Sequence, residues 1–314
     1  MSSDSSISRR RLLGTVGGYV GATALGIAVA SPQEETPPPP DAIGMLYDTT
    51  RCIGCKACVS ECTKLNGLQP DTRMSGGIWQ MPAGLNTETK NIIQLYQAEE
   101  TDDWSFVKRQ CMHCVDPACV DGCPFHALRK EEKGIVTWDG SRCIGCRYCQ
   151  VACPYEVPKF EWDAFNPKIV KCEFCRHVLG KPAEEGGQPE PGCTTVCPTG
   201  AVIFGQRRDL LDEAHGRVAK TPGKYYDERV YGEVEGGGTQ VLYLAHVPFE
   251  KIGLPELPRE SSAHTSKKVH RFFTSWLVFP IALYAVFASL IKMNWKEHED
   301  DVARVEAKGL KEQL

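Results

Sequence analysis

The cysteines constrain this chain more than any other feature. All sixteen fall into four groups of four, and none is left over. Group one is Cys52, Cys55, Cys58 and Cys62; group two is Cys111, Cys114, Cys119 and Cys123; group three is Cys143, Cys146, Cys149 and Cys153; group four is Cys172, Cys175, Cys193 and Cys197. A [4Fe–4S] cluster is a cube whose four iron corners each take one thiolate. The count therefore predicts four [4Fe–4S] clusters.

The spacing within the groups is typical of bacterial ferredoxins. Groups one and three follow C-x2-C-x2-C-x3-C, and Pro154 follows group three. Group two has four residues between its second and third cysteines and is followed by Pro124. Group four has seventeen residues between Cys175 and Cys193 and is followed by Pro198. In such runs the fourth cysteine normally ligates the other cluster of a pair. We therefore expect paired groups to exchange their last cysteines.

Other uses of these cysteines fit the spacing less well. Disulfide frameworks are typical of short secreted chains, and this chain has 314 residues. Zinc sites use paired C-x2-C arms but rarely a C-x2-C-x2-C-x3-C-P run. A thioredoxin-type dithiol needs only one C-x2-C beside a βαβ pattern. His113, His126 and His177 lie next to cysteines, but sixteen thiolates leave no ligand position for a histidine.

The first thirty residues predict an export signal. Arg9, Arg10 and Arg11 form a twin-arginine pattern, followed by a mildly apolar stretch and a small-residue cleavage site at 28–30. The alternative is an N-terminal membrane anchor, but four glycines between Gly14 and Gly21 make the stretch weakly apolar. The twin-arginine route carries folded cargo, which suits clusters assembled in the cytoplasm. We predict a signal peptide at 1–30 and a Pro-rich linker at 31–42.

The C-terminal region contains a candidate membrane span. Residues 272–291 are twenty residues without a charge, about 30 Å of helix and enough to cross a bilayer. Trp276 and Trp295 lie near its two ends, as interface anchors often do. The alternative is a buried core helix. With the export signal, the sequence predicts a single-pass anchor, a cluster domain on the periplasmic side of the inner membrane and a cytoplasmic tail at 292–314.

Between these ends the sequence predicts an α+β protein of two ferredoxin-like modules, a duplicated two-cluster fold spanning 43–205. Arg51-Cys52-Ile53-Gly54-Cys55 recurs ninety-one residues later as 142–146, which indicates the duplication. We expect a hairpin of strands 127–130 and 135–138, and further strands at 201–204 and 241–245. Aromatic residues between 155 and 165 are expected to cover a cluster. Residues 206–271 form either a decorative extension or a docking strip for partner subunits, and we favour docking.

Charged residues add two indications. The net charge of −4 does not suggest nucleic-acid binding. A cation beside a cluster favours its reduced form and raises its potential, although each such side chain, taken singly, is more simply a solvated one. The cations next to cysteines are Arg51, Lys56, Arg109, Arg142, Arg147, Lys171 and Arg176.

Together the cysteine order, the signal and the anchor resemble a known family. The chain is similar to the four-cluster ferredoxin-type electron-transfer subunits of bacterial respiratory complexes, and most of all to the iron–sulfur subunits of hydrogenase-2, the HybA-like proteins. The segments that carry this resemblance are 44–48, 108–117, 146–149, 198–205 and 235–242. The resemblance covers most of 43–258 and the single anchor. The loop from Gly180 to Gly192 varies among relatives, so its contacts are left open.

The resemblance implies which cysteines share a cluster. In the family, group one pairs with group four, and group two with group three. Carried over, four quartets result: quartet 1 is Cys52, Cys55, Cys58 and Cys197; quartet 2 is Cys111, Cys114, Cys119 and Cys153; quartet 3 is Cys143, Cys146, Cys149 and Cys123; quartet 4 is Cys172, Cys175, Cys193 and Cys62.

The resemblance also implies a function. The chain would relay electrons between a periplasmic [NiFe] hydrogenase, with its small and large subunits, and an integral membrane quinone-reacting subunit. A molybdopterin catalytic subunit, as in formate dehydrogenase or in dimethyl sulfoxide, polysulfide or tetrathionate reductase, is the alternative partner. The sequence contains no nucleophile or acid–base pair, so we expect no catalysis by this chain alone. A reductase acting at an open cluster corner is disfavoured because no cysteine is missing, and a structural zinc scaffold would be colourless.

Overall fold

The computed structural model describes residues 37–98, 103–162 and 167–312. The predicted signal peptide, the first part of the linker, and Phe165 of the aromatic stretch lie outside the described residues. Everything below concerns the unit that begins at residue 37.

A three-stranded sheet lies at the centre of this unit, in the order β8-β1-β9. Strand β1 (Ile43–Asp48) runs antiparallel to β8 (Val202–Gln206) and parallel to β9 (Val241–Leu244). Met45 and Leu46 point to opposite faces of β1, and both are fully buried. The strand is therefore covered on both faces, which explains why it reads as a continuous apolar run. Helix α6 (Arg207–Lys220) packs on one face through an apolar stripe containing Leu210 and Ala214.

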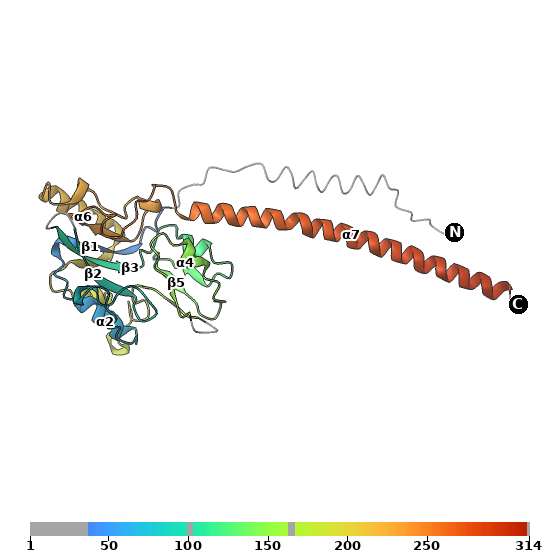
Figure 1. Ribbon diagram of the computed structural model, residues 1–314, viewed down its shortest axis with the longest axis horizontal. Coiled ribbons are helices and arrows are strands. Elements are labelled where there is room, and N and C mark those ends of the chain that lie inside the picture. The colour runs from blue at the N-terminus through green and yellow to red at the C-terminus, as the bar shows by residue number, and fades with distance from the viewer. Residues whose placement is uncertain (1–36, 99–102, 163–166, 313–314) are drawn as a thin grey trace. The chain divides into compact units, whose positions relative to one another are not determined.

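Four short helices carry cysteines and pack in two pairs. Helix α2 (Ala57–Leu65) packs against α5 (Gly192–Thr195), and α3 (Ala118–Asp121) packs against α4 (Tyr148–Ala152). The first pair belongs to groups one and four, next to β1 and β8. The second pair belongs to groups two and three, next to the hairpin of β4 (Leu128–Lys130) and β5 (Val136–Trp138). Figure 1 shows α2 and α4 in different parts of the molecule. The predicted α+β class and the predicted hairpin are confirmed.

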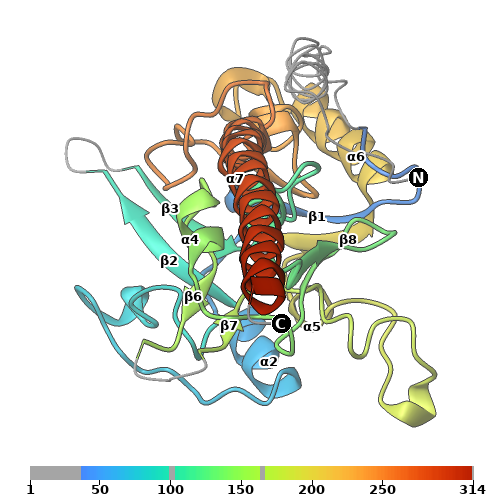
Figure 2. The same ribbon diagram turned by 90° about the vertical axis from the view of Figure 1, so that its right-hand side faces the viewer.

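Two further hairpins cover the cysteine loops. Strand β2 (Asn91–Gln97) pairs with β3 (Trp104–Gln110), and β6 (Lys159–Phe160) pairs with β7 (Ile169–Val170). Figure 2, in which α7 (Ala263–Glu312) is seen nearly end-on, shows β2 and β3 to the left of that helix, with β6 and β7 below them. Short 3-10 helices complete the description: Thr49–Arg51, Ile78–Gln80, Ala183–Glu185, Tyr226–Glu228 and Glu235–Gly237.

Much of the segment predicted as a docking extension is packed into the core. Residues 206–271 supply α6 and β9, and β9 is buried along its whole length. The Tyr243 hydroxyl of β9 donates a hydrogen bond to the carbonyl oxygen of Lys108 at 2.6 Å. The sequence predicts a separate extension because the segment has no cysteine. Nothing in its sequence identifies β9 as the parallel partner of β1.

Helix α7 contains the predicted membrane span and, inside it, Pro280. Its first turns are bound to the α3 region, where the Lys267 ammonium lies 2.8 Å from a carboxylate oxygen of Asp116 and 3.6 Å from one of Asp121. Within the described residues, no helix combines the length and the apolarity needed to cross a membrane.

Candidate iron–sulfur sites

Quartet 1 surrounds a hollow beside β1. Its lining contains all four cysteines, Cys52, Cys55, Cys58 and Cys197, which come from two ends of the cysteine region. Tyr47, Ile93 and Val202 supply apolar walls. The empty volume is about 330 Å³. Three cysteines of group one therefore face the last cysteine of group four around one space.

Quartet 3 surrounds a second hollow of about 300 Å³. Its cysteines are Cys123, Cys143, Cys146 and Cys149. Phe125, Phe160 and Ile169 form part of its wall, so one aromatic residue of the stretch between 155 and 165 faces this space. The last cysteine again comes from another group, here group two.

The thiols of the other two quartets are also mutual neighbours. In quartet 2, Cys119 is surrounded by Cys111, Cys114 and Cys153. In quartet 4, Cys62 lies near Cys172 and Cys175, and Cys193 lies near Cys62 and Cys172. The structure thus brings together the cysteines of each predicted quartet. Within the described ranges, no group of three or more His, Cys, Asp or Glu side chains is arranged to hold a single metal ion. Ligation of clusters by the quartets stays a prediction.

The four cysteine loops share one backbone feature. The residue before the second cysteine is left-handed in every loop: φ is 68° at Gly54, 48° at His113, 72° at Gly145 and 50° at Phe174. This conformation turns the backbone amide groups inward and creates a concave surface suited to anions. The Gly54 amide donates to the Cys52 sulfur at 3.4 Å, and the Phe174 amide donates to the Cys172 sulfur at 3.5 Å.

Two of these positions are occupied by residues that favour the conformation less than glycine does. The rings of His113 and Phe174 stack on each other, with centroids 3.9 Å apart. Nδ1 of His113 accepts a hydrogen bond from the Val136 amide at 3.0 Å. Burial lowers the pKa of His113 well below its ordinary value, so the imidazole is neutral. Mutual packing therefore holds the two strained loops in place.

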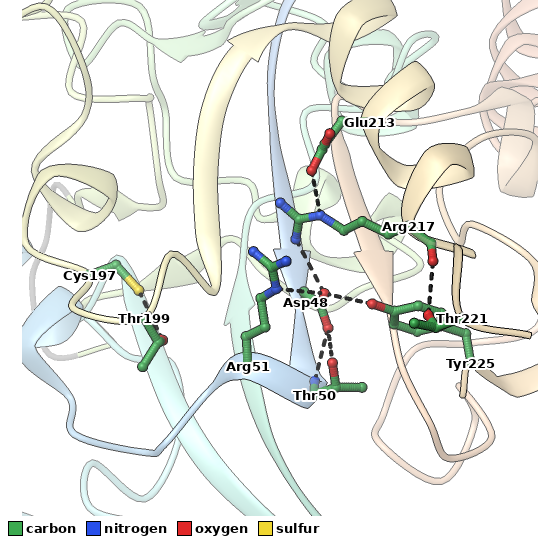
Figure 3. Close-up of polar contacts among 9 residues, drawn as sticks. All are labelled: Asp48, Thr50, Arg51, Cys197, Thr199, Glu213, Arg217, Thr221 and Tyr225. Atoms are coloured by element: carbon green, nitrogen blue, oxygen red, sulfur yellow. Dashed lines mark hydrogen bonds and ion pairs between the residues drawn. The ribbon is translucent and has the colours of Figure 1, made fainter. Parts of the chain in front are cut away.

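Amide and hydroxyl groups also point at the last cysteines. The Ala127 amide donates to the Cys123 sulfur at 3.3 Å. At Cys197 burial disfavours ionisation, but hydrogen bonds from the amide of Val202 and from the amide and hydroxyl of Thr199 outweigh it and lower the pKa. Figure 3 shows the Thr199 hydroxyl beside this sulfur, at 3.8 Å.

Most of the buried thiols are hard to ionise without a bound cation. Burial raises the pKa of Cys58 and Cys111 to about 11, and that of Cys62 and Cys149 to about 12. A cluster takes thiolates, so its binding would release protons from these residues. Hollows lined by four sulfurs, with amides directed at those sulfurs, fit thiolate-ligated cubes. The sixteen thiols would hold the clusters, which supply one-electron transfer when bound.

A buried polar network supports the loop of quartet 1 (Figure 3). Asp48, at the end of β1, accepts hydrogen bonds from the Thr50 amide at 3.0 Å and from the Tyr225 hydroxyl at 3.0 Å. It also accepts a hydrogen bond from the Thr50 hydroxyl at 2.6 Å and pairs with Arg217 of α6, at 3.2 Å, and with Arg51, at 3.6 Å. The network fixes the residue that precedes Cys52 to the core.

The cations expected near cysteines mostly have other partners. Arg142 pairs with Asp139 at 3.6 Å, and Arg176 pairs with Glu173 at 3.5 Å. The Arg147 guanidinium stacks on the Trp162 ring at 3.8 Å. Lys171 differs because it is buried. The two other histidines that lie next to cysteines in the sequence, His126 and His177, are exposed.

Sequence reasoning missed Lys108, which is fully buried among the cysteines. The Cys58, Cys172 and Cys193 thiols are its main charged neighbours. One signal was available: Lys108 interrupts the apolar pattern of a strand in which Phe106 and Val107 are buried.

An α+β protein with two modules, each bringing together two cysteine quartets, belongs to the ferredoxin-type iron–sulfur proteins. Comparison with known proteins agrees. Residues 51–127 and residues 102–207 each match the 4Fe-4S dicluster domain. Each match covers a continuous stretch of the chain. In space, by contrast, group one lies with group four, and group two lies with group three.

Whole-chain relatives are more specific. The chain is 40% identical to the Hydrogenase-2 operon protein HybA of Escherichia coli O157:H7 over 298 residues, covering 85% of this chain and 89% of the relative. It is 34% identical to the formate dehydrogenase-O iron-sulfur subunit of Escherichia coli K12 over 230 residues, covering 70% and 73%. The nitrate-inducible formate dehydrogenase iron-sulfur subunit of the same strain is 33% identical over 226 residues, covering 69% and 74%. The chain therefore belongs to the iron–sulfur protein family that includes HybA and these formate dehydrogenase subunits.

Proposed function

We propose that this protein is an electron-transfer subunit with four [4Fe–4S] clusters, which relays electrons between a periplasmic [NiFe] hydrogenase and a membrane quinone-reacting subunit. The chain would have no catalytic activity of its own. The choice of hydrogenase follows the 40% identity to a hydrogenase-2 operon protein over most of both chains. Membership of an iron–sulfur subunit family supports the relay itself.

The observation that carries the proposal is the order of the quartets in space. Lys108 has thiols of both quartet 1 and quartet 4 as neighbours. The Cys111 thiol of quartet 2 lies near Cys172 of quartet 4. Helices α3 and α4, which pack together, carry Cys119 of quartet 2 and Cys149 of quartet 3. The quartets therefore follow one another in the order 1, 4, 2, 3, as a relay requires.

The two ends of this series are the parts open to partners. Cys55 of quartet 1 and Cys146 of quartet 3 are exposed, whereas every cysteine of quartet 4 is buried. An exposed isoleucine accompanies each: Ile53 is 56% exposed and Ile144 is 60% exposed. We take these two isoleucines as the contact points that the proposed partners would cover.

We further propose that the quartet 3 end faces the membrane. Helix α7 is attached at its start to Asp116 and Asp121, next to α3 and therefore close to quartets 2 and 3. The proposed anchor is segment 272–291, which has no charged residue. Large apolar side chains of α7, including Phe279, Ile281 and Phe287, are exposed and would be covered by lipid or by a membrane subunit. A twin-arginine signal at 1–30 would place the cluster domain in the periplasm.

A molybdopterin dehydrogenase is the second candidate partner, because the chain is also 33–34% identical to formate dehydrogenase iron-sulfur subunits. Quinone reduction by membranes from a strain that lacks this chain distinguishes the two candidate partners. Complementation with the wild-type chain should restore hydrogen-dependent reduction of quinone. Restoration of formate-dependent reduction alone would favour the second candidate.

Iron analysis of paired variants tests the sites directly. Anaerobically purified protein should be brown and contain about sixteen irons per chain, four for each cube. Cys52→Ala with Cys197→Ala removes two members of quartet 1, and we expect a loss of about four irons. Cys52→Ala with Cys62→Ala removes two members of group one that belong to different quartets, and should remove about eight. Equal losses would contradict the quartets, and colourless protein would contradict the relay.

A further inference from the structure

Two lysines are buried in the cluster-binding core without a carboxylate. Lys108 is 0% exposed and Lys171 is 2% exposed. The Lys108 ammonium donates to the side-chain oxygen of Gln110. The Lys171 ammonium donates to the carbonyl oxygens of Val136 and, at 3.1 Å, of Cys172. Among the residues that the structure describes, neither lysine forms an ion pair with Asp or Glu.

Lys108 lies where quartets 1 and 4 meet. Its hydrogen-bond partner Gln110 donates to the Met45 sulfur at 3.3 Å, and the same sulfur lies 4.0 Å from the sulfur of Cys193. The thiol of Cys58, from quartet 1, is another close charged neighbour. The charged neighbours of the ammonium therefore include thiols of both quartets.

Lys171 lies where quartets 4 and 2 meet. It directly precedes Cys172 of quartet 4 and is hydrogen-bonded to the carbonyl oxygen of that residue. Its charge also acts on Cys111 and Cys119 of quartet 2. Quartet 4, which has no exposed cysteine, is thus flanked by both lysines.

A buried ammonium needs a nearby negative charge, because removing it from water is unfavourable and only a close anionic partner compensates for the lost hydration. Among the described residues around the two lysines, the groups able to supply a negative charge are the cysteines, as thiolates, and what the thiolates hold. A thiolate-ligated cube is an anion, and reduction adds one more negative charge. A cation at this place stabilises the reduced form, and low local dielectric strengthens the effect.

We propose that Lys108 and Lys171 are internal counter-ions that raise the reduction potentials of the clusters in quartets 1, 4 and 2, with quartet 4 affected by both. This inference rests on the proposed function, since it requires the quartets to hold clusters. Exposed cations next to cysteines contribute far less because solvent screens them.

Redox titration followed by EPR tests the inference on the full-length protein. Lys108→Met and Lys171→Met remove the charge and keep an unbranched side chain. Arg176→Gln is the matched control, since Arg176 follows Cys175 of quartet 4 but is 48% exposed at its side chain. We expect each lysine variant to reduce the ratio of reduced to oxidised cluster about tenfold at a fixed potential, or about 59 mV for one electron, and the control to change it less than twofold.

The counter-ion role also predicts which cluster potentials shift in each variant. Lys108→Met should shift the quartet 1 and quartet 4 potentials, and Lys171→Met those of quartets 4 and 2, so only one potential shifts in both variants. Potentials that match the control in cluster-loaded variants would overturn the inference. Wild-type protein without clusters would instead overturn the proposed function, and iron analysis separates these results.

A second substitution is used if a methionine variant loses its clusters. Lys108→Gln and Lys171→Gln keep a hydrogen-bond donor for the Gln110 and Val136 oxygens while removing the charge. They carry the same expected shift. Loss of iron confined to the flanked quartets in both replacements also supports the counter-ion role, whereas full iron with potentials unchanged from the control rejects it.

Discussion

Gly54 and Gly145 occupy equivalent places in the repeated sequence, and the structure shows why glycine is needed there. Both have a left-handed backbone, and neither has room for a side chain. A Cβ atom at Gly54 would lie 2.4 Å from the ring of Phe106, and one at Gly145 would lie 2.7 Å from Pro167. Each loop is therefore fixed by backbone conformation and by close packing at the same residue.

Substitution of Gly54 separates these two effects. Gly54→Ala should destabilise the protein by more than about 2 kcal/mol, because a left-handed alanine costs about 1–2 kcal/mol and the clash with Phe106 adds to it. Gly67→Ala is the control: φ is 60° and no atom lies within 4 Å of its Cβ position. Thermal unfolding and iron content should show a smaller effect for Gly67→Ala. Equal effects would mean that packing at Gly54 is unimportant.

The sequence indicated some site residues and not others, for physical reasons. Cysteine spacing and the repeated glycine are local features of the chain, so the groups and the β4–β5 hairpin could be predicted from it. The left-handed conformation of His113 and Phe174 could not, because it depends on a stack between residues sixty-one positions apart. The burial of Lys108 likewise depends on residues distant in the chain, since Cys58 and Cys193 are among its neighbours.

At the scale of elements, β1 holds together the module that contains groups one and four. It is hydrogen-bonded on both edges, to β8 and to β9, and its last residue leads into the first cysteine loop. Asp48 connects that end to α6 through Arg217, and both side chains are nearly inaccessible to solvent. A single carboxylate thus joins the sheet, a helix and the quartet 1 loop. The chain order hides this connection, since Asp48 and Arg217 are 169 residues apart.

Removal of this carboxylate should be costly. We expect Asp48→Ala to lower the free energy of unfolding by about 3 kcal/mol, because Arg217 keeps Glu213 but loses its buried partner. Arg208→Ala is the control, since Arg208 pairs with Asp209 at 3.1 Å on the surface and such pairs contribute about 0–1 kcal/mol. Urea unfolding of anaerobic samples measures both. A change below 1 kcal/mol for Asp48→Ala would show that the network is dispensable.

At the scale of the whole molecule, the described fold places two chemically similar ends in different settings. Ile53 and Ile144 occupy the same place in the repeated Arg-Cys-Ile-Gly-Cys sequence, and each lies beside an exposed cysteine. Only the quartet 3 end belongs to the module that holds the start of α7. The proposed orientation of the relay, with the quartet 3 end toward the membrane, follows from this asymmetry. Sequence alone could not assign it, because the repeats are identical at these positions.

The matched pair Ile53→Asp and Ile144→Asp tests that assignment. A carboxylate in an apolar contact loses water without gaining a partner, so each variant should weaken one interface at least about tenfold, or about 1.4 kcal/mol. We expect Ile144→Asp to weaken binding of the membrane subunit and Ile53→Asp to weaken binding of the hydrogenase small subunit. Anaerobic binding measurements in detergent, with iron content checked first, give both affinities for both variants. Each variant is the control for the other, because the two residues occupy equivalent places in the repeat at opposite ends of the quartet series. Loss of the same partner in both variants, or reversal of the two, would contradict the proposed orientation.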